Sequence, residues 1–126
     1  MALPIFGLAE AAIKLTEQRT SILADNITNA STPNYKARDI DFHQILKDYQ
    51  NKAETTTNTK ELDSLKQNIT NNQLLFRVPM QTSLDGNTVD DNIERSNFLQ
   101  NSLRYQLSLT YIQNKSNEIE KALSGV

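Results

Sequence analysis

Paired acidic residues are the groups in this 126-residue sequence whose spacing could support chemistry. Asp39 and Asp41 lie two residues apart, so in an extended segment their carboxylates share one face and could bind a hard cation weakly. Asp90 and Asp91 directly precede a long helical pattern, where carboxylates commonly accept hydrogen bonds from the first backbone N–H groups. We therefore expect solvated charges or turn acceptors at the first pair and helix capping at the second pair.

The other residue types that catalysis or metal binding requires are absent or isolated. His43 is the single histidine, and the sequence has no cysteine, which excludes disulfides, zinc–thiolate sites and thiol nucleophiles. The serines and threonines have no plausible general base for a nucleophilic triad. The three glycines are too far apart to form a phosphate-binding loop. The sequence therefore predicts no enzyme activity, no cofactor and no metal, with His43 as a surface or packing residue.

The composition limits the class of protein further. Hydrophobic residues make up 37% of the chain and tryptophan is absent, so a large core is difficult to close within one chain. Two interpretations remain open: a small helical protein with a loose loop, or a subunit that completes its core against neighbours. The net charge is −2, from 13 basic and 15 acidic residues without a basic patch, which gives nucleic-acid binding no electrostatic basis.

The N-terminal stretch MALPIFGLAEAAIKL could be mistaken for a secretory signal. No basic residue precedes Lys14, however, and Glu10 interrupts the apolar run. No stretch of the sequence approaches the roughly 18 apolar residues that a membrane span requires. We expect a soluble protein that is made in the cytosol and has no stable membrane insertion.

The candidate residues must be positioned by two long terminal helices. The first is expected from Ile5 to about Ala30, where a pattern alternates spacings of four and three as in a heptad seam. Its members are Leu8, Ala12, Leu15, Arg19, Ile22, Asn26 and Asn29. Polar residues in such a seam either specify a register or partner, or rotate to solvent as the helix drifts from the heptad. The pattern leaves both possibilities open, and Pro33 prevents the helix from continuing.

The second helix is expected to begin near Thr88 and Asp91, a capping-box-like pair, and to run to about Leu123. One stripe along it keeps a strict spacing of four and three: Phe98, Ser102, Tyr105, Leu109, Ile112, Ser116, Ile119 and Leu123. A second stripe lies beside the first: Leu99, Leu103, Gln106 or Leu107, and Thr110. Two stripes on one helix require more than one partner helix. The chain supplies only one such partner, so the pattern favours assembly.

The first part of the middle region is expected to be extended and then polar. Tyr35–Phe42 alternates as a short strand does, and the apolar residues from Phe42 to Tyr49 suggest one or two turns of helix. Residues 50–72 form a polar tract with scattered asparagine and charges of both signs. We interpret this tract as a mobile, mostly exposed insertion.

The second part of the middle region predicts a small hairpin or paired extended segments. Leu74–Val78 and Thr88–Val89 lie on either side of an Asp85–Gly86 turn. Its apolar side chains would be Phe76, Val78, Met80, Leu84 and Val89. The predicted fold is a single, mainly α domain, with a helix in residues 1–31, the middle region in residues 32–88 and a helix in residues 89–126. The two long helices are expected to pack side by side as a coiled-coil-like pair.

Three blocks of sequence carry a resemblance to a known family: LADNITNASTPNYKARDIDF from Leu23, FRVPMQTSLDGNTV from Phe76, and NSLRYQLSLT from Asn101. They resemble the flagellar axial proteins of the rod and hook, in the same order, and the continuation into Arg38–Phe42 is similar to the proximal rod proteins of that family. The chain departs from the family at Asn34, where glycine is usual. Asparagine tolerates positive φ better than other residues with a side chain, so the turn can survive.

The resemblance implies a structural subunit of the basal body that polymerises through its terminal helices, which form the innermost tube layer in axial proteins. It implies partners among other rod proteins, the adaptor that joins the rod to the MS ring, and the flagellar export apparatus. It also implies a location in the rod, on the periplasmic side, reached through the type III export channel without a cleaved signal peptide.

Two groups of residues are expected to carry assembly. The helix-packing group, within and between subunits, is Leu15, Arg19, Ile22, Asn26, Asn29, Leu103, Leu109, Ile112 and Ile119. The junction group, between the helix layer and the outer segment, is Pro33, Tyr35, Arg38, Leu84, Asp85 and Gly86. The alternative is a cytosolic helical adaptor that folds alone and binds one partner helix.

Overall fold

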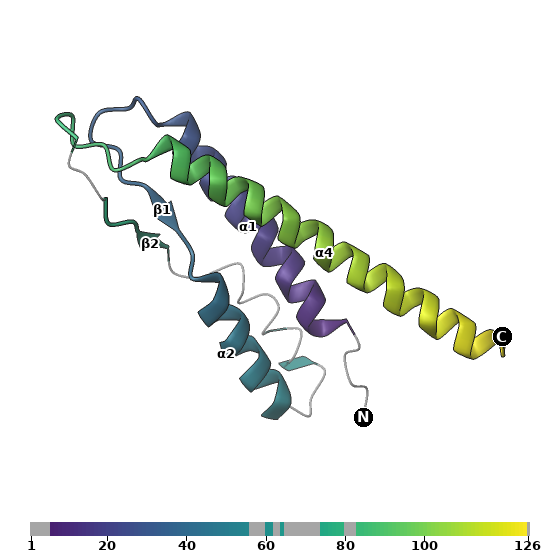
Figure 1. The fold of residues 1–126 in the computed structure, drawn as a ribbon. Coiled ribbons are helices and arrows are strands. Elements are labelled where there is room, and N and C mark those ends of the chain that lie inside the picture. Colours follow the sequence, from purple (N-terminus) through teal and green to yellow (C-terminus); the bar gives the residue numbers. More distant parts are fainter. Residues whose placement is uncertain (1–5, 56–59, 62–63, 65–73, 80–82, 126) are drawn as a thin grey trace.

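The computed structural model describes residues 6–55, 60–61, 64, 74–79 and 83–125. In chain order the elements are α1 (Gly7–Thr28), β1 (Arg38–Asp39), α2 (Phe42–Thr55), β2 (Leu75–Phe76) and α4 (Asp91–Ser124). Figure 1 shows α1 and α4 side by side and in opposite directions, with α2 along the other side of α1. The predicted fold class is confirmed: the two terminal helices pair, and a small antiparallel sheet lies between them in the chain.

The hydrophobic core lies between α1 and α2. Its buried residues are Ala11, Leu15, Ile40, Phe42 and Tyr49, with Ala12, Ile22, Ile45, Leu46 and Ala53 packed against them. These side chains come from α1, from the end of the extended segment and from one face of α2. The fully buried side chains that α4 contributes are instead polar, namely Glu94 and Asn101.

Helix α2 is longer than the sequence indicated. The predicted one or two turns are a helix of 14 residues that continues to Thr55, so the first residues of the predicted polar insertion are helical. Phe42, Ile45, Tyr49 and Ala53 follow helical spacing and place their apolar side chains toward α1. Most of the rest of the predicted insertion, at positions 56–59, 62–63 and 65–73, lies outside the described residues.

The predicted hairpin partner was wrong. Strand β2 pairs with β1, with Arg38 opposite Phe76 and Asp39 opposite Leu75. The backbone N–H of Thr88 donates to the carbonyl of Tyr35 at 3.0 Å, so both halves of the predicted hairpin bond to the segment at 35–39 and not to each other.

The side chains expected to hold the hairpin are correspondingly exposed. Phe76, Val78 and Leu84 are among the exposed large hydrophobic residues, Val89 is half-buried, and Met80 lies outside the described residues. The Asp85–Gly86 turn is hydrogen-bonded to the turn that follows α1, because the N–H of Asn34 donates to the carbonyl of Asp85 at 2.8 Å. After this turn the chain at Thr88 therefore runs beside Tyr35 and not beside β2.

Helix α4 begins one residue after its cap. The carboxylate of Asp90 accepts hydrogen bonds from the backbone N–H groups of Asn92 and Ile93, which confirms capping at Asp90 and corrects the expected role of Thr88. The Thr88 hydroxyl instead accepts from the N–H of Ala37 at 2.8 Å. The helix ends at Gly125, whose φ of 71° is typical of a left-handed C-cap.

The two terminal helices differ in length. Helix α1 has 22 residues and α4 has 34, which correspond to about 33 Å and 51 Å. The C-terminal part of α4 therefore extends past the described start of α1 (Figure 1). It has no partner element over its last turns in the described part of the chain.

Candidate functional site

Four charged side chains meet where α1, α4 and the small sheet converge, and we call this group the charged junction: Arg19, Asp39, Arg77 and Glu94. Arg19 holds Asp39 with two hydrogen bonds of 2.9 Å, from Nε to Oδ1 and from Nη2 to Oδ2. Arg77 bridges the two acids, donating to Asp39 Oδ2 at 2.6 Å and to Glu94 Oε1. The group has two positive and two negative charges, so it is neutral as a whole.

The charged junction is shielded from water, most completely at Glu94, which is fully buried. A buried carboxylate is tolerated only where charged or hydrogen-bonded partners compensate for lost hydration. Burial opposes ionisation of Asp39 most strongly, but the hydrogen bond and charge of Arg19, the Ile40 N–H and the charge of Arg77 together lower its pKa below the ordinary value. Asp39 is therefore ionised at neutral pH and forms the centre of the group.

Asn26 connects the charged junction to the backbone of β1. Its Nδ2 donates to Glu94 Oε2 at 3.0 Å and to the Arg38 carbonyl at 2.7 Å. Its Oδ1 accepts from the Arg38 N–H at 3.1 Å and from the Tyr35 hydroxyl at 3.4 Å. One fully buried amide thus fixes the position of β1 relative to both α1 and α4.

A second polar cluster closes the turn after α1. The buried Asn87 donates through Nδ2 to the carbonyls of Asn29, Ala30 and Thr32, at 2.9, 3.1 and 2.8 Å. These carbonyls lie at and just beyond the end of α1, where backbone acceptors have no partner within the helix. The Asn87 Oδ1 accepts from the N–H of Val89 at 2.7 Å, so the same side chain joins the end of α1 to the segment that leads into α4.

Gly86 lies where the Asp85–Gly86 turn comes closest to the turn after α1. Its φ is +73°, and a Cβ at this position would lie 2.5 Å from Asn34 Oδ1. Asn34 itself has a φ of 61°, as expected for a residue that replaces glycine in a left-handed turn. The Lys36 ammonium donates to the Gly86 carbonyl at 2.6 Å, which holds the two turns together.

Gly86→Ala is expected to lower the free energy of unfolding by about 2 kcal/mol, because the left-handed backbone alone disfavours a side chain by roughly 1–2 kcal/mol and the new Cβ also meets Asn34. Gly125→Ala is the matched control, since it has φ +71° with nothing within 4 Å. Urea unfolding of both variants measures the difference. Equal stability of the two variants would show that the contact with Asn34 contributes nothing.

The structure brings together part of the predicted helix-packing group. Leu15, Arg19 and Asn26 are buried, and Ile22 and Asn29 are half-buried. Two of the three polar residues of the seam, Arg19 and Asn26, therefore point into the molecule, whereas the amide of Asn29 forms an exposed hydrogen bond with the Asp25 carbonyl. On α4 the predicted residues are less covered: Leu109, Ile112 and Ile119 are half-buried and Leu103 is exposed. Their contacts with other subunits stay a prediction.

The predicted junction group divides into two parts. Tyr35 and Arg38 are half-buried and meet at the amide of Asn26. Asp85 and Gly86 lie against the Asn34 turn, and the hydroxyl of Ser83 and the Asn87 N–H both donate to the Asp85 carboxylate, which lowers its pKa. Pro33 and Leu84 are exposed, at the surface of their turns.

Sequence reasoning found Arg19 and Asn26 but missed the other residues that hold this site together. Asp39 was expected to be a solvated charge or a turn acceptor, but it forms the centre of the charged junction; Asp41 does act as a turn acceptor, to the Gln44 N–H at 3.2 Å. Glu94 lies in the first turn of α4, where a negative charge is favoured by the helix dipole alone, so its position gave no sign that it is buried in the charged junction. Asn101, also fully buried, donates to the Thr16 carbonyl at 2.8 Å and to the Thr20 hydroxyl at 2.7 Å.

A signal for Glu94 and Asn101 was available, because they are seven residues apart and hence occupy the same heptad position. An apolar stripe does not include them, because both side chains are polar. Arg77 and Asn87 had no comparable local signal.

The described residues offer little else for chemistry. No group of three or more His, Cys, Asp or Glu side chains within them could hold a metal ion. His43 is exposed at the edge of the Phe42 ring, with its Nε2 3.4 Å from Arg104 Nη2. No helix in the described ranges is long and apolar enough to cross a membrane.

The fold and the site define a class: a helical subunit whose paired terminal helices are fixed by buried polar groups, while apolar side chains of the longer helix stay exposed. The family model described as "Flagella basal body rod protein" matches residues 8–36. That match covers α1 from its second residue, Pro33 and Tyr35, and so includes residues 23–36 of the first block on which the resemblance was based.

Relatives extend the similarity along the chain. The flagellar basal body rod protein FlgB of Salmonella typhimurium is 41% identical over 124 residues, covering 92% of this chain and 90% of the relative. FlgB of Proteus mirabilis is 41% identical over 118 residues, covering 87% of this chain and 86% of the relative. FlgB of Escherichia coli is 43% identical over 109 residues, with 80% and 79% covered. The chain belongs to the FlgB family of flagellar basal body rod proteins.

Proposed function

We propose that this protein is a structural subunit of the proximal rod of the flagellar basal body, and that it supports motility by polymerising through its terminal helices. The observation that carries the proposal is the 41% identity to a FlgB protein over 92% of the chain. An alignment of that length spans both terminal helices and the two polar clusters that join them. The relatives do not favour the alternative of a cytosolic adaptor.

The structure supports a mechanical role for the charged junction. It links α1, β1, the residue after β2 and α4 through side chains that satisfy one another. Such a network fixes orientation, because any rotation of one element breaks several charged hydrogen bonds at once. The exposed leucines of α4 are thereby held at a defined angle, as a subunit needs when it adds to a growing tube.

The partners that this role requires are other rod proteins, the adaptor between rod and MS ring, and the export apparatus. The protein would reach the periplasmic part of the rod by flagellar export without a cleaved signal peptide. Catalysis, nucleic-acid binding and stable membrane insertion have no part in this function. The assembly half of the proposal is open to a genetic test.

Deletion of the gene in its host is expected to leave the MS ring and export apparatus in place and to remove rod, hook and filament, as seen by electron cryotomography. The wild-type gene should restore swimming, whereas Leu109→Asp/Ile112→Asp should not, because it places charges on the half-buried face of α4. Ser124→Asp, exposed on the last residue of α4, is the control and should restore swimming. If cells that lack the gene swim and carry complete basal bodies, the proposal is refuted and the cytosolic adaptor becomes the interpretation to test.

A further inference from the structure

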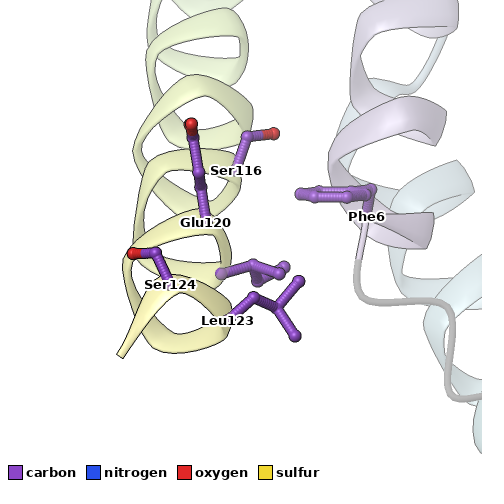
Figure 2. Close-up of a pocket in the computed structure, with 6 residues that line it drawn as sticks. Phe6, Ser116, Glu120, Leu123 and Ser124 are labelled. Atoms are coloured by element: carbon purple, nitrogen blue, oxygen red, sulfur yellow. The ribbon is translucent and has the colours of Figure 1, made fainter. Parts of the chain in front are cut away.

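The last turns of helix α4 border an open groove between this helix and the start of α1. The groove has a volume of about 500 Å³ and is lined by Phe6, Ser116, Ile119, Glu120, Leu123 and Ser124. Figure 2 shows the Phe6 ring directed across this space toward α4, and Leu123 directed back toward it. We call this space the end groove. Leu123 is 84% exposed, so the described residues leave the apolar side of the groove uncovered.

Phe6 is also the residue at which the chain enters the end groove. It directly precedes α1, and its carbonyl accepts the N–H of Glu10 at 2.8 Å, so the first turn of the helix fixes its backbone. The five residues before it, MALPI at positions 1–5, are therefore attached to one wall of the groove. A segment attached in this way has a high effective concentration at the groove, and any second molecule has to compete with it.

The antiparallel packing of α1 and α4 sets the direction in which the chain leads into the end groove. Asn26 bonds to Glu94, and the Thr16 carbonyl bonds to Asn101. Each step toward the start of α1 is therefore a step toward the end of α4. A chain that keeps this direction before α1 runs along the turns of α4 that extend past α1 (Figure 1).

The length and the chemistry of MALPI match the end groove. Five residues of extended chain reach at most about 17 Å, and α4 from Ser116 to Ser124 is about 12 Å long, so the segment can cover the whole groove. None of its side chains carries a charge or a strong hydrogen-bonding group, and such side chains enter an apolar groove without losing hydrogen bonds to water. Pro4 favours extended backbone at the residue before it and has no N–H that burial would leave without a partner.

We propose that residues 1–5 occupy the end groove of their own chain, antiparallel to the last turns of α4, with Ile5 near Ile119 and Leu3 near Leu123. The contact removes apolar side chains of both segments from water and so stabilises the end of α4. It also closes the groove to another copy, so that contacts between copies fall on other faces of the helix. The inference concerns the single subunit and does not depend on the proposed function.

The absence of cysteine makes an introduced pair a direct test, because every disulfide reports that pair. Leu3→Cys/Leu123→Cys in the purified full chain should form a disulfide within one chain, seen as a faster band on a non-reducing gel. The matched control is Leu3→Cys/Lys121→Cys. Lys121 is exposed at the same end of α4, but it lies two residues from Leu123 and hence about 200° around the helix. The effective concentration of the first pair, measured against glutathione, should exceed that of the control about tenfold or more.

Ile5→Cys/Ile119→Cys is the second pair, and it keeps the test decisive if the first pair does not fold. It should also close within one chain, because the antiparallel course places Ile5 nearer to α1 than Leu3. Equal closure of the Leu123 and Lys121 pairs would overturn the proposal, since residues 1–5 would then favour no side of α4. Dimers in place of closed monomers, in dilute protein, would assign the end groove to another copy and would also overturn it.

A charge placed in the end groove tests whether apolar contact holds the segment. Leu123→Asp, added to the Ile5→Cys/Ile119→Cys chain, should lower the effective concentration of that pair about tenfold, because burial of one leucine is worth that order of effect. Lys121→Asp, on the other side of the same turn, is the control and should leave the effective concentration unchanged. If Leu123→Asp also leaves it unchanged, the groove does not hold residues 1–5 and the proposal is refuted.

Discussion

Glu94→Ala is expected to lower the free energy of unfolding by about 3 kcal/mol, the largest effect of any single change in the charged junction. Glu94 is fully buried and accepts from Arg77 and from Asn26. Its removal leaves a largely buried guanidinium without one of its two acids, and breaking one partner of a buried pair typically removes 3–5 kcal/mol. Urea unfolding of the purified chain, followed by circular dichroism, measures the change.

The matched control is Glu118→Ala on the same helix. Glu118 pairs with Lys115 at 2.9 Å, but both side chains are exposed, and exposed pairs contribute only about 0–1 kcal/mol. If the two variants unfold at the same urea concentration, Glu94 is not a structural charge. Arg77→Ala/Glu94→Ala should be less destabilised than the sum of the two single variants, because neither unpaired charge remains.

The sequence predicted those elements whose signals are local. Both terminal helices follow apolar and heptad periodicity over many turns, so their existence and nearly all of their length could be read from spacing alone. The turn after α1 could be read from Pro33, and the positive φ at Asn34 from the residue type. At these positions, neighbours within a few residues determine the backbone.

The charged junction could not be predicted because its members are distant in the sequence. Arg19, Asp39 and Arg77 come from α1, β1 and the residue after β2, and each is separated from the next by at least 20 positions. A charged residue in a polar sequence gives no local sign that it will be buried. The pairing of β2 with β1 has the same origin, since Arg77 is drawn to Asp39 and not to the segment at 88–89.

The buried polar residues and the exposed leucines in the middle of α4 lie on different faces of the helix, whereas Leu109, Ile112 and Ile119 of the predicted helix-packing group are half-buried. Glu94 and Asn101 face α1 through hydrogen bonds, whereas Leu99, Leu103 and Leu107 face outward. An apolar contact between α1 and α4 would compete with neighbouring helices for the same kind of surface. A polar contact does not, because a leucine of a neighbour cannot replace the amide of Asn101 or the carboxylate of Glu94. The separation of a polar face from an apolar face therefore lets α4 pair with α1 of its own chain before it contacts another copy.

Asn87→Asp is expected to lower the free energy of unfolding by about 3 kcal/mol at neutral pH, although the side chain keeps its shape. The amide Nδ2 that donates to the carbonyls of Asn29, Ala30 and Thr32 becomes an oxygen. The three carbonyls then lose this donor, and only those of Asn29 and Thr32 keep another, from the N–H groups of Thr32 and Tyr35. An unsatisfied group costs about 1–3 kcal/mol, and a negative charge now faces the three oxygens. Asn92→Asp, exposed in the first turn of α4, is the control and should change stability by less than about 0.5 kcal/mol.

The pH dependence of Asn87→Asp identifies the cause of the loss. The three carbonyls oppose ionisation, so the pKa of the introduced carboxyl is higher in the folded protein than in the unfolded chain. The unfolded state therefore releases its proton first, and the deficit is present above the folded-state pKa and shrinks as the pH falls through it. Below it, the protonated carboxyl can donate one hydrogen bond to a carbonyl of the α1 turn. A deficit that is independent of pH, when measured by urea unfolding from neutral to acidic pH, would show that the loss comes from packing and not from the donor that ends α1.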